Sequence, residues 1–455
     1  MSNNSGGAAG DQWERLAADW QPVTKRSGYT VGLCMILLAI VLMPLLYFSI
    51  IAAIGYGTWW HLTANAPDFA RGPGRASLGL LVLYALPGVA GVILIIVLLK
   101  PIFAPRARNG KPIVLEKFEE PELFDFVERV CTAIGAPVPK EIHLDCNVNA
   151  SASFRSGIFS LFRSGDLVLT IGMPLVAGMT KRQFAGVLAH EFGHFAQGAG
   201  MRTTYVAGTF VNWCARVAFE RDQWDIWLQE MRDTRDPRLA VIGMLLQLCL
   251  WATRMVVRVL AFVGMMLCSF MLRRMEYDAD RYEIQFAGSE DFAKASQRLY
   301  ELGEAVPITM EECRRMYLKN KQVPNNFPAL VADYCKRLPP ETRDAVLENI
   351  RTDKSGLFAT HPSTRARIAA AEKLNMPGLY TDETSARQLF GDFTAASIKA
   401  TYGHWSGMLE SEFKFVTMID TMPMLKMSGR NESKHDAVTS YLGFEPPTWR
   451  PFFPG

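Results

Sequence analysis

Two long stretches without a formal charge constrain this chain more than any other feature. The first lies between Arg26 and Asp68, and the second runs from Ala76 to Leu99. Each exceeds the roughly 20 apolar residues that a helix needs to cross a hydrocarbon core about 30 Å thick. Core helices of soluble proteins rarely stay apolar on all sides for so long. We therefore expect two transmembrane helices and a connecting loop, with bounds 29–57, 76–103 and 58–75.

The remaining composition is typical of a folded domain attached to membrane anchors. The 455 residues are 49% hydrophobic and 20% charged, and the mean hydropathy is +0.07, which excludes a disordered chain. A net charge of +3 provides no strong electrostatic attraction for nucleic acid, so we expect no nucleic-acid partner. The two apolar stretches make the lipid bilayer the expected partner. The eight cysteines form no C-x-x-C pair, which favours reduced thiols over a cysteine metal site.

Basic residues flank the two expected spans unevenly. Five lie from Lys100 to Lys117, three lie in the tail before the first span, and two lie in the loop. Because cytoplasmic flanks carry the excess of Lys and Arg, we expect the tail 1–28 and the domain after residue 103 in the cytoplasm. Reduced cysteines agree with that compartment.

A third apolar zone, from Leu239 to Leu272, allows several interpretations. Arg254 and Arg258 divide it, and neither half reaches about 18 residues. Three interpretations stay open: two short spans, a helix pair at the membrane surface, or one long buried helix. No glycine or proline lies between Gly243 and Gly264, so nothing marks a tight hairpin turn there.

The rest of the chain is expected to mix helices with a few strands. Apolar residues at helical spacing predict a helix over 118–137, and β-branched runs predict strands at Glu141–Leu144 and Asp166–Ile171. Thr180-Lys-Arg-Gln183 matches a capping box, in which the Thr hydroxyl and the Gln amide bind free backbone N–H groups. A helix is therefore expected over Lys181–Gln197.

That helix carries the sequence His190-Glu191-Phe192-Gly193-His194. Two histidines four residues apart lie on one helical face, where both imidazoles reach a single zinc ion. Glu191 then lies beside the open zinc position and can act as a general base. By composition alone this pattern is expected roughly 0.01 times in such a chain, so a chance occurrence is a poor explanation.

Catalytic zinc normally takes three protein ligands, so one more is needed. A metzincin histidine is excluded because position 200 is glycine. Glu276 is the best candidate, and Asp280 follows one helical turn later, where a carboxylate can orient a ligating histidine. The residues alone also allow a solvated acidic helix start paired with Arg273 and Arg274.

The motifs together resemble the HtpX-type membrane zinc proteases, which share a family with the CAAX prenyl proteases. Four segments resemble that family in the same order along the chain. They are Asn149-Ala-Ser-Ala152, Val187-Leu-Ala-His-Glu-Phe-Gly-His194, Glu276-Tyr-Asp-Ala-Asp280 and Thr360-His-Pro-Ser-Thr-Arg-Ala-Arg-Ile368. The resemblance implies a mainly helical α+β fold, namely a gluzincin-type zincin domain with a small β-sheet, attached to the transmembrane helices.

The resemblance also implies roles for individual residues. Glu276 becomes the third ligand of one Zn²⁺ per chain, beside His190 and His194. Asp280 supports the zinc histidines, and Arg367 is its nearby electrostatic partner. His361 faces the active site and can stabilise the oxyanion of the tetrahedral state.

Substrate contacts follow from the same resemblance. Asn149 and Ala150, with the Asp166–Ile171 strand, are expected to line the substrate cleft. A zincin holds an extended peptide along an edge strand by backbone hydrogen bonds, so protein or peptide substrates of many sequences fit.

These expectations give a domain plan and a function. The protease domain covers 104–374, with a membrane-proximal helical insert at about 202–272, and 375–455 has no assigned role. His404 and His435 there lack ligand-like spacing and are expected at the surface. We expect a membrane-anchored zinc endopeptidase of the bacterial inner membrane, acting on misfolded membrane proteins in quality control. A non-proteolytic zinc scaffold for membrane clients and a prenyl-peptide endopeptidase remain as alternatives.

Overall fold

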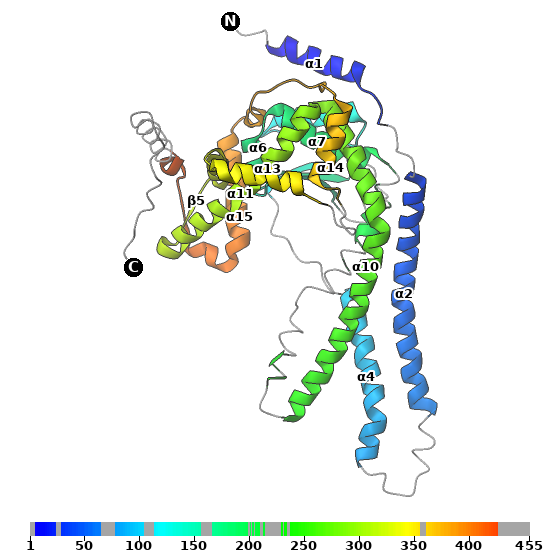
Figure 1. The fold of residues 1–455 in the computed structure, drawn as a ribbon. Coiled ribbons are helices and arrows are strands. Elements are labelled where there is room, and N and C mark those ends of the chain that lie inside the picture. Colours follow the sequence, from blue (N-terminus) through cyan, green and yellow to red (C-terminus); the bar gives the residue numbers. More distant parts are fainter. Residues whose placement is uncertain are drawn as a thin grey trace.

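The computed structural model is mostly helical, with two small sheets (Figure 1). It describes residues 5–23, 29–64, 78–103, 113–155, 166–198, 237–354 and 361–425, with isolated positions between 201 and 233. Much of the expected insert before residue 237 therefore lies outside the described residues. His435, and the rest of the chain after residue 425, lie outside them too.

The described helices and strands follow one another along the chain with these bounds. They are α1 Ser5–Asp19, α2 Tyr29–Ala64, α4 Leu78–Phe103, β1 Ile113–Leu115, α5 Pro121–Ile134, β2 Glu141–Asp145, β3 Ala150–Phe154, β4 Leu167–Gly172, α6 Met173–Gly178, α7 Lys181–Ala196, α10 Pro237–Ala287, α11 Ser289–Asn320, β5 Gln322–Pro324, α12 Phe327–Lys336, α13 Pro340–Thr352, α14 Thr364–Leu374, η2 Ala386–Leu389, α15 Phe393–Leu409, η3 Glu410–Phe415 and β6 Thr417–Ile419.

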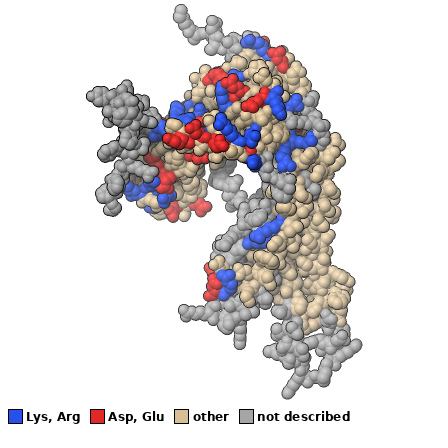
Figure 2. Space-filling view, viewed as in Figure 1, with Lys and Arg blue, Asp and Glu red and all other residues tan. Residues whose placement is uncertain are grey.

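Helices α2, α4 and the first part of α10 form a column that extends from a mixed domain (Figure 1). The visible face of this column is largely free of charged side chains, whereas Lys, Arg, Asp and Glu gather on the domain (Figure 2). Among the described residues, Thr30–Ala64 is long and apolar enough to cross a membrane. Leu250–Met266 and Cys268–Ala287, the two parts of a bent helix, pass the same test only when taken together.

The third apolar zone forms one continuous helix, α10, which is 51 residues long and bends by 42° between Met266 and Cys268. This agrees with a single long helix among the three interpretations, but the helix is not simply buried. Large apolar side chains at spacings of three and four residues remain 41–58% exposed along one face. They are Met244, Leu248, Trp251, Met255, Val259, Phe262 and Met266.

The domain is built on a four-stranded sheet of order β1-β2-β4-β3. Strand β4 pairs with β2 in parallel and with β3 antiparallel, so it lies inside the sheet and β3 forms the edge. Both expected strands are present, as β2 and β4. The sequence interpretation missed β3, whose small residues Ala150, Ser151 and Ala152 give a weak strand signal.

Helix α7 begins at the expected capping box. The Gln183 backbone N–H donates to the Thr180 hydroxyl, and the Gln183 side chain accepts from the Thr180 backbone N–H. The helix then packs against α10 with two glycines at the contact. A Cβ at Gly186 would lie 2.8 Å from the Ala287 Cβ, and a Cβ at Gly193 would lie 2.8 Å from the Tyr282 ring. Only glycine lets the two helices approach this closely.

The region after residue 375 belongs to the same domain as far as it is described. Strand β6 pairs with β5, and Trp405 of α15 is 3% exposed within the main core. His404 stacks on Phe327 with ring centroids 5.2 Å apart. The expectation of a surface position for His404 is therefore wrong, because an aromatic neighbour covers its ring.

The contact at Gly186 yields a stability prediction. Gly186→Ala places a methyl group against Ala287, and overpacking of this kind costs about 1–3 kcal/mol. We expect a lower free energy of unfolding in detergent, measured by denaturant titration, although alanine is the better helix former. Gly303→Ala in α11 is the matched control, since nothing lies within 4 Å of its added Cβ. The control is expected to gain about 0.5–1 kcal/mol, and an equal loss in both variants would contradict the packing argument.

Candidate metal centre

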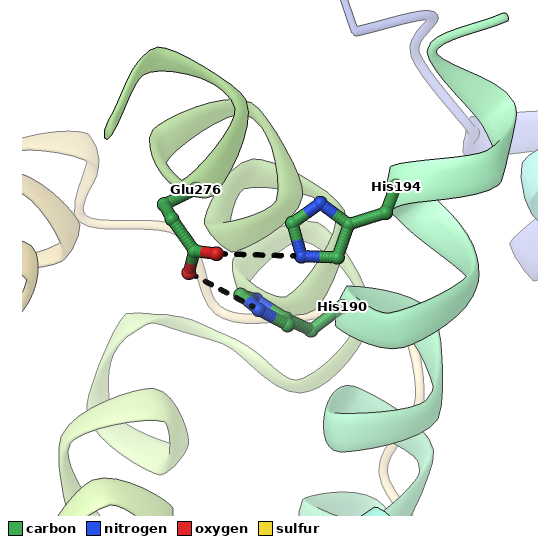
Figure 3. A group of neighbouring side chains, drawn as sticks. All are labelled: His190, His194 and Glu276. Atoms are coloured by element: carbon green, nitrogen blue, oxygen red, sulfur yellow. Dashed lines mark ion pairs between the residues drawn. The ribbon is translucent and has the colours of Figure 1, made fainter. Parts of the chain in front are cut away.

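Two helices bring three candidate metal ligands together. His190 and His194 project from successive turns of α7, and Glu276 projects toward them from α10 (Figure 3). The Nε2 atom of His190 lies 3.7 Å from Oε2 of Glu276, and the Nε2 atom of His194 lies 3.7 Å from Oε1. One donor atom from each residue lies within 4.8 Å of the other two. The structure thus juxtaposes the three residues that the sequence predicts as ligands.

The donor set fits zinc in chemistry and in spacing. Two imidazole nitrogens and a carboxylate oxygen are common zinc ligands, at about 2.0–2.2 Å from the metal. A tetrahedral centre with such bonds separates its donor atoms by about 3.4 Å. The observed 3.7 Å separations require only a small contraction.

Charged groups behind His190 fix the orientation of its ring. Its Nδ1 atom lies 3.2 Å from Oδ1 of Asp280, which leaves Nε2 on the side of Glu276. Asp280 is 2% exposed, and Nε of Arg367 donates to both of its oxygens at 3.0 and 3.1 Å. A proton on Nδ1, on the side of the Asp280 carboxylate, would leave the Nε2 lone pair available to a metal.

The two histidines differ in their proton affinity. Burial lowers the pKa of His194, and the nearby charge of His190 lowers it further, to about 4. Burial also disfavours charge on His190, but the Asp280 and Glu276 carboxylates outweigh it and raise its pKa to about 9. Because a metal must displace the proton of His190, we infer that metal binding strengthens as the pH rises.

Glu191 lies between the metal ligands and the edge strand β3. The backbone N–H of Ala152 in β3 is close enough to favour the ionised form of its carboxylate. Burial raises the pKa of Glu191, and the charge of Glu276 adds to the effect. A carboxylate with a raised pKa is a better proton acceptor, as general base catalysis requires.

His361 lies beside the site, as predicted, but it contacts a candidate ligand. Its Nδ1 atom lies 3.0 Å from Oε1 of Glu276, and its side chain is 68% exposed. This hydrogen bond raises the pKa of His361. The contact orients Glu276, while oxyanion stabilisation by His361 stays a prediction.

The two residues predicted to contact the substrate, Asn149 and Ala150, differ in their exposure to solvent. Asn149 is exposed, and its carbonyl accepts from the Gly172 N–H at 2.8 Å, whereas Ala150 is buried at the start of β3. The expectation that the Asp166–Ile171 strand offers a free edge is wrong, because β4 is paired on both sides. Among the described strands of this sheet, β3 lies at the edge next to β4.

The sequence interpretation missed Glu283. This residue is 6% exposed, its Oε2 lies 3.6 Å from Nδ1 of His190, and burial raises its pKa to about 7. With His190 and Asp280 it forms a second group that could hold a metal. Its position seven residues after Glu276, on the same helical face, was the available signal.

Comparison with known proteins gives a consistent result. The model of peptidase family M48 matches residues 117–375. "Protease HtpX homolog" of Bacteroides fragilis is 24% identical over 272 residues, covering 59% of this chain and 72% of the relative. "Protease HtpX homolog" of Bordetella pertussis is 23% identical over 312 residues, covering 67% and 88%. "Protease HtpX" of Shewanella denitrificans is 26% identical over 279 residues, covering 60% and 88%. No solved structure matches the chain.

The two possible ligand groups can be distinguished by matched substitutions on one helix. If the metal binds His190, His194 and Glu276, Glu276→Ala lowers zinc affinity by more than about 100-fold, while Glu283→Ala lowers it by about 10-fold or less. Zinc content by atomic emission and titration with a competing chelator measure both. The reverse order would place the metal with His190, Asp280 and Glu283.

Proposed function

Because this chain belongs to peptidase family M48 and is HtpX-like, we propose that it is a membrane-anchored, zinc-dependent endopeptidase. The proposal depends on one observation above all. His190, His194 and Glu276 converge from two helices, with Glu191 next to them on α7. A purely structural zinc site has no need of the adjacent carboxylate.

The proposed reaction is hydrolysis of a peptide bond. Bound zinc, held by His190, His194 and Glu276, would polarise the scissile carbonyl and lower the pKa of water. The Glu191 carboxylate accepts a proton from the attacking water and passes it to the leaving amine nitrogen. Asp280 holds His190 in the required tautomer, and Arg367 keeps Asp280 ionised.

The edge of β3 supports an extended substrate. Asn149 and Arg155 form backbone hydrogen bonds with Gly172 at the end of β4 and with Asp166 just before it, so alternate residues between them direct their backbone groups away from β4. These are Ala150, Ala152 and Phe154. Since the backbone of Ala152 lies near Glu191, a peptide paired along this edge passes close to the proposed base. Backbone pairing of this kind accepts many side chains.

Membrane anchoring rests on the helical column. Helix α2 is long enough to cross a bilayer, and the exposed apolar stripe of α10 covers 22 residue steps from Met244 to Met266, or about 33 Å. That length is close to the thickness of the hydrocarbon core. We place the chain in the bacterial inner membrane with the domain in the cytoplasm, where misfolded membrane proteins are its substrates.

Glu191→Gln separates a protease from a non-proteolytic scaffold. The variant keeps the size and hydrogen bonding of the side chain but cannot accept the proton, so zinc content stays at the wild-type level while casein cleavage falls by at least about 100-fold. Detergent-purified protein is assayed with and without chelator. Glu383→Gln, an exposed carboxylate on the domain surface, serves as the control and retains activity. Cleavage by Glu191→Gln at the wild-type rate would falsify the assigned base.

The proposed orientation predicts the accessibility of the domain surface. In a variant without native cysteines, Phe118→Cys introduces a thiol at a side chain that is 82% exposed. With a cytoplasmic domain, a membrane-impermeant maleimide labels it in lysed cells and not in intact spheroplasts. Labelling of intact spheroplasts would reverse the orientation.

A further inference from the structure

The N-terminal segment 12–23 precedes the region matched by family M48, yet it packs into the core of the domain. Leu16 of α1 is 1% exposed, and Trp13, Trp20 and Val23 pack against the same cluster. The Gln12 amide also donates to the Thr381 hydroxyl at 3.2 Å. These apolar contacts make the segment part of the folded domain. A tail that only precedes the first membrane helix would not need them.

Trp13 lies where three elements meet. Its ring contacts Phe126 of α5, Phe286 of α10 and Tyr380, with centroid distances of 5.7, 6.0 and 5.3 Å. The guanidinium of Arg129 lies 6.0 Å from the same ring. One tryptophan of α1 therefore connects α10 to α5 and to the segment after α14.

Trp20 lies directly behind the ligand helices. It stacks on Tyr282 of α10 at 6.0 Å and 29°, and contacts Phe286 one turn later at 5.9 Å. Tyr282 also lies against Gly193, the residue just before His194. A continuous packed path thus runs from Trp20 through Tyr282 to the zinc-binding turn of α7.

We propose that residues 12–23 are a positioning clamp for the metal centre. All three candidate ligands come from α7 and α10, so the separation of these two helices decides whether the donor atoms converge. Trp20 packs on Tyr282 of α10 and so supports the contact between α10 and α7. Trp13 packs on Phe286 and supports the next turn of α10. The inference rests on the proposed zinc site, and Trp13 and Trp20 act through their neighbours without touching a ligand.

The rate of zinc release tests the clamp separately from proteolysis. Zinc-loaded, full-length protein in detergent is mixed with a chromogenic chelator at a temperature well below its unfolding transition. Trp20→Ala is expected to release zinc about 10-fold faster, an effect at the lower end of the roughly 10–100-fold loss of affinity that follows loss of an outer-shell partner. Trp20→Phe keeps an aromatic ring on Tyr282 and is expected to restore slow release.

Trp405→Ala is the matched control for general destabilisation. Trp405 packs in the same core cluster as the partly buried Trp20 and is itself buried, but it contacts Phe327 and donates to the Pro324 carbonyl. Its loss is expected to lower the melting temperature and leave zinc release unchanged.

The possible results separate the clamp from the zinc site itself. Release from Trp20→Ala at the wild-type rate, or equal acceleration by Trp405→Ala, would overturn the clamp while leaving the proposed function intact. A wild-type protein that binds no zinc would overturn both. A zinc-binding wild type without peptidase activity would overturn only the protease.

Discussion

The close contact between α7 and α10 is the constraint on which the site depends. Gly186 and Gly193 let the backbones approach until Ala287 and Tyr282 fill the space of a missing Cβ. At that separation, donor atoms of two histidines on one helix and of a glutamate on the other lie close enough together to bind one metal ion. A larger separation of α7 and α10 would move Glu276 away from a metal bound to the two histidines. It would also move Asp280 and Glu283 away from Nδ1 of His190. Packing therefore determines the chemistry here, and the N-terminal segment adds to that packing from behind.

Burial of several charges in this helix pair has a physical cost that their mutual contacts offset. Asp280 and Glu283 are almost fully enclosed, and desolvation alone would favour their protonated forms. The guanidinium of Arg367 and the imidazole of His190 keep the pKa of Asp280 low, whereas the pKa of Glu283, which lacks an equally close cation, rises. The site thus holds one carboxylate that stays ionised and one poised near neutrality. The direct contacts of Arg367 with Asp280, and the shorter distance of Asp280 to Nδ1 of His190 (3.2 Å against 3.6 Å for Glu283), account for this difference.

Local rules predicted the parts of the molecule that short-range chemistry determines. The capping box, the His190–His194 pair and strands β2 and β4 follow from spacing and propensity, and the distal Glu276 needed a family resemblance as well. Three features resisted prediction because they depend on long-range packing. Strand β3 has small residues and is defined by its partner β4, Glu283 is buried only because α7 lies over it, and the N-terminal tryptophans find their places hundreds of residues away in sequence.

Because the exposed apolar stripe and Glu276 lie on the same helix, α10 limits which bonds the proposed protease can reach. Its exposed apolar stripe ends at Met266, and Glu276 follows ten residues later on the same helix. At about 1.5 Å per residue, the candidate ligand lies about 15 Å from the end of this stripe, measured along a helix that bends by 42° just after Met266. An extended chain advances about 3.3 Å per residue. In the proposed membrane-anchored enzyme, a peptide bond in a transmembrane segment of the substrate therefore reaches the candidate metal ligands only after the chain has left the bilayer by up to about five residues.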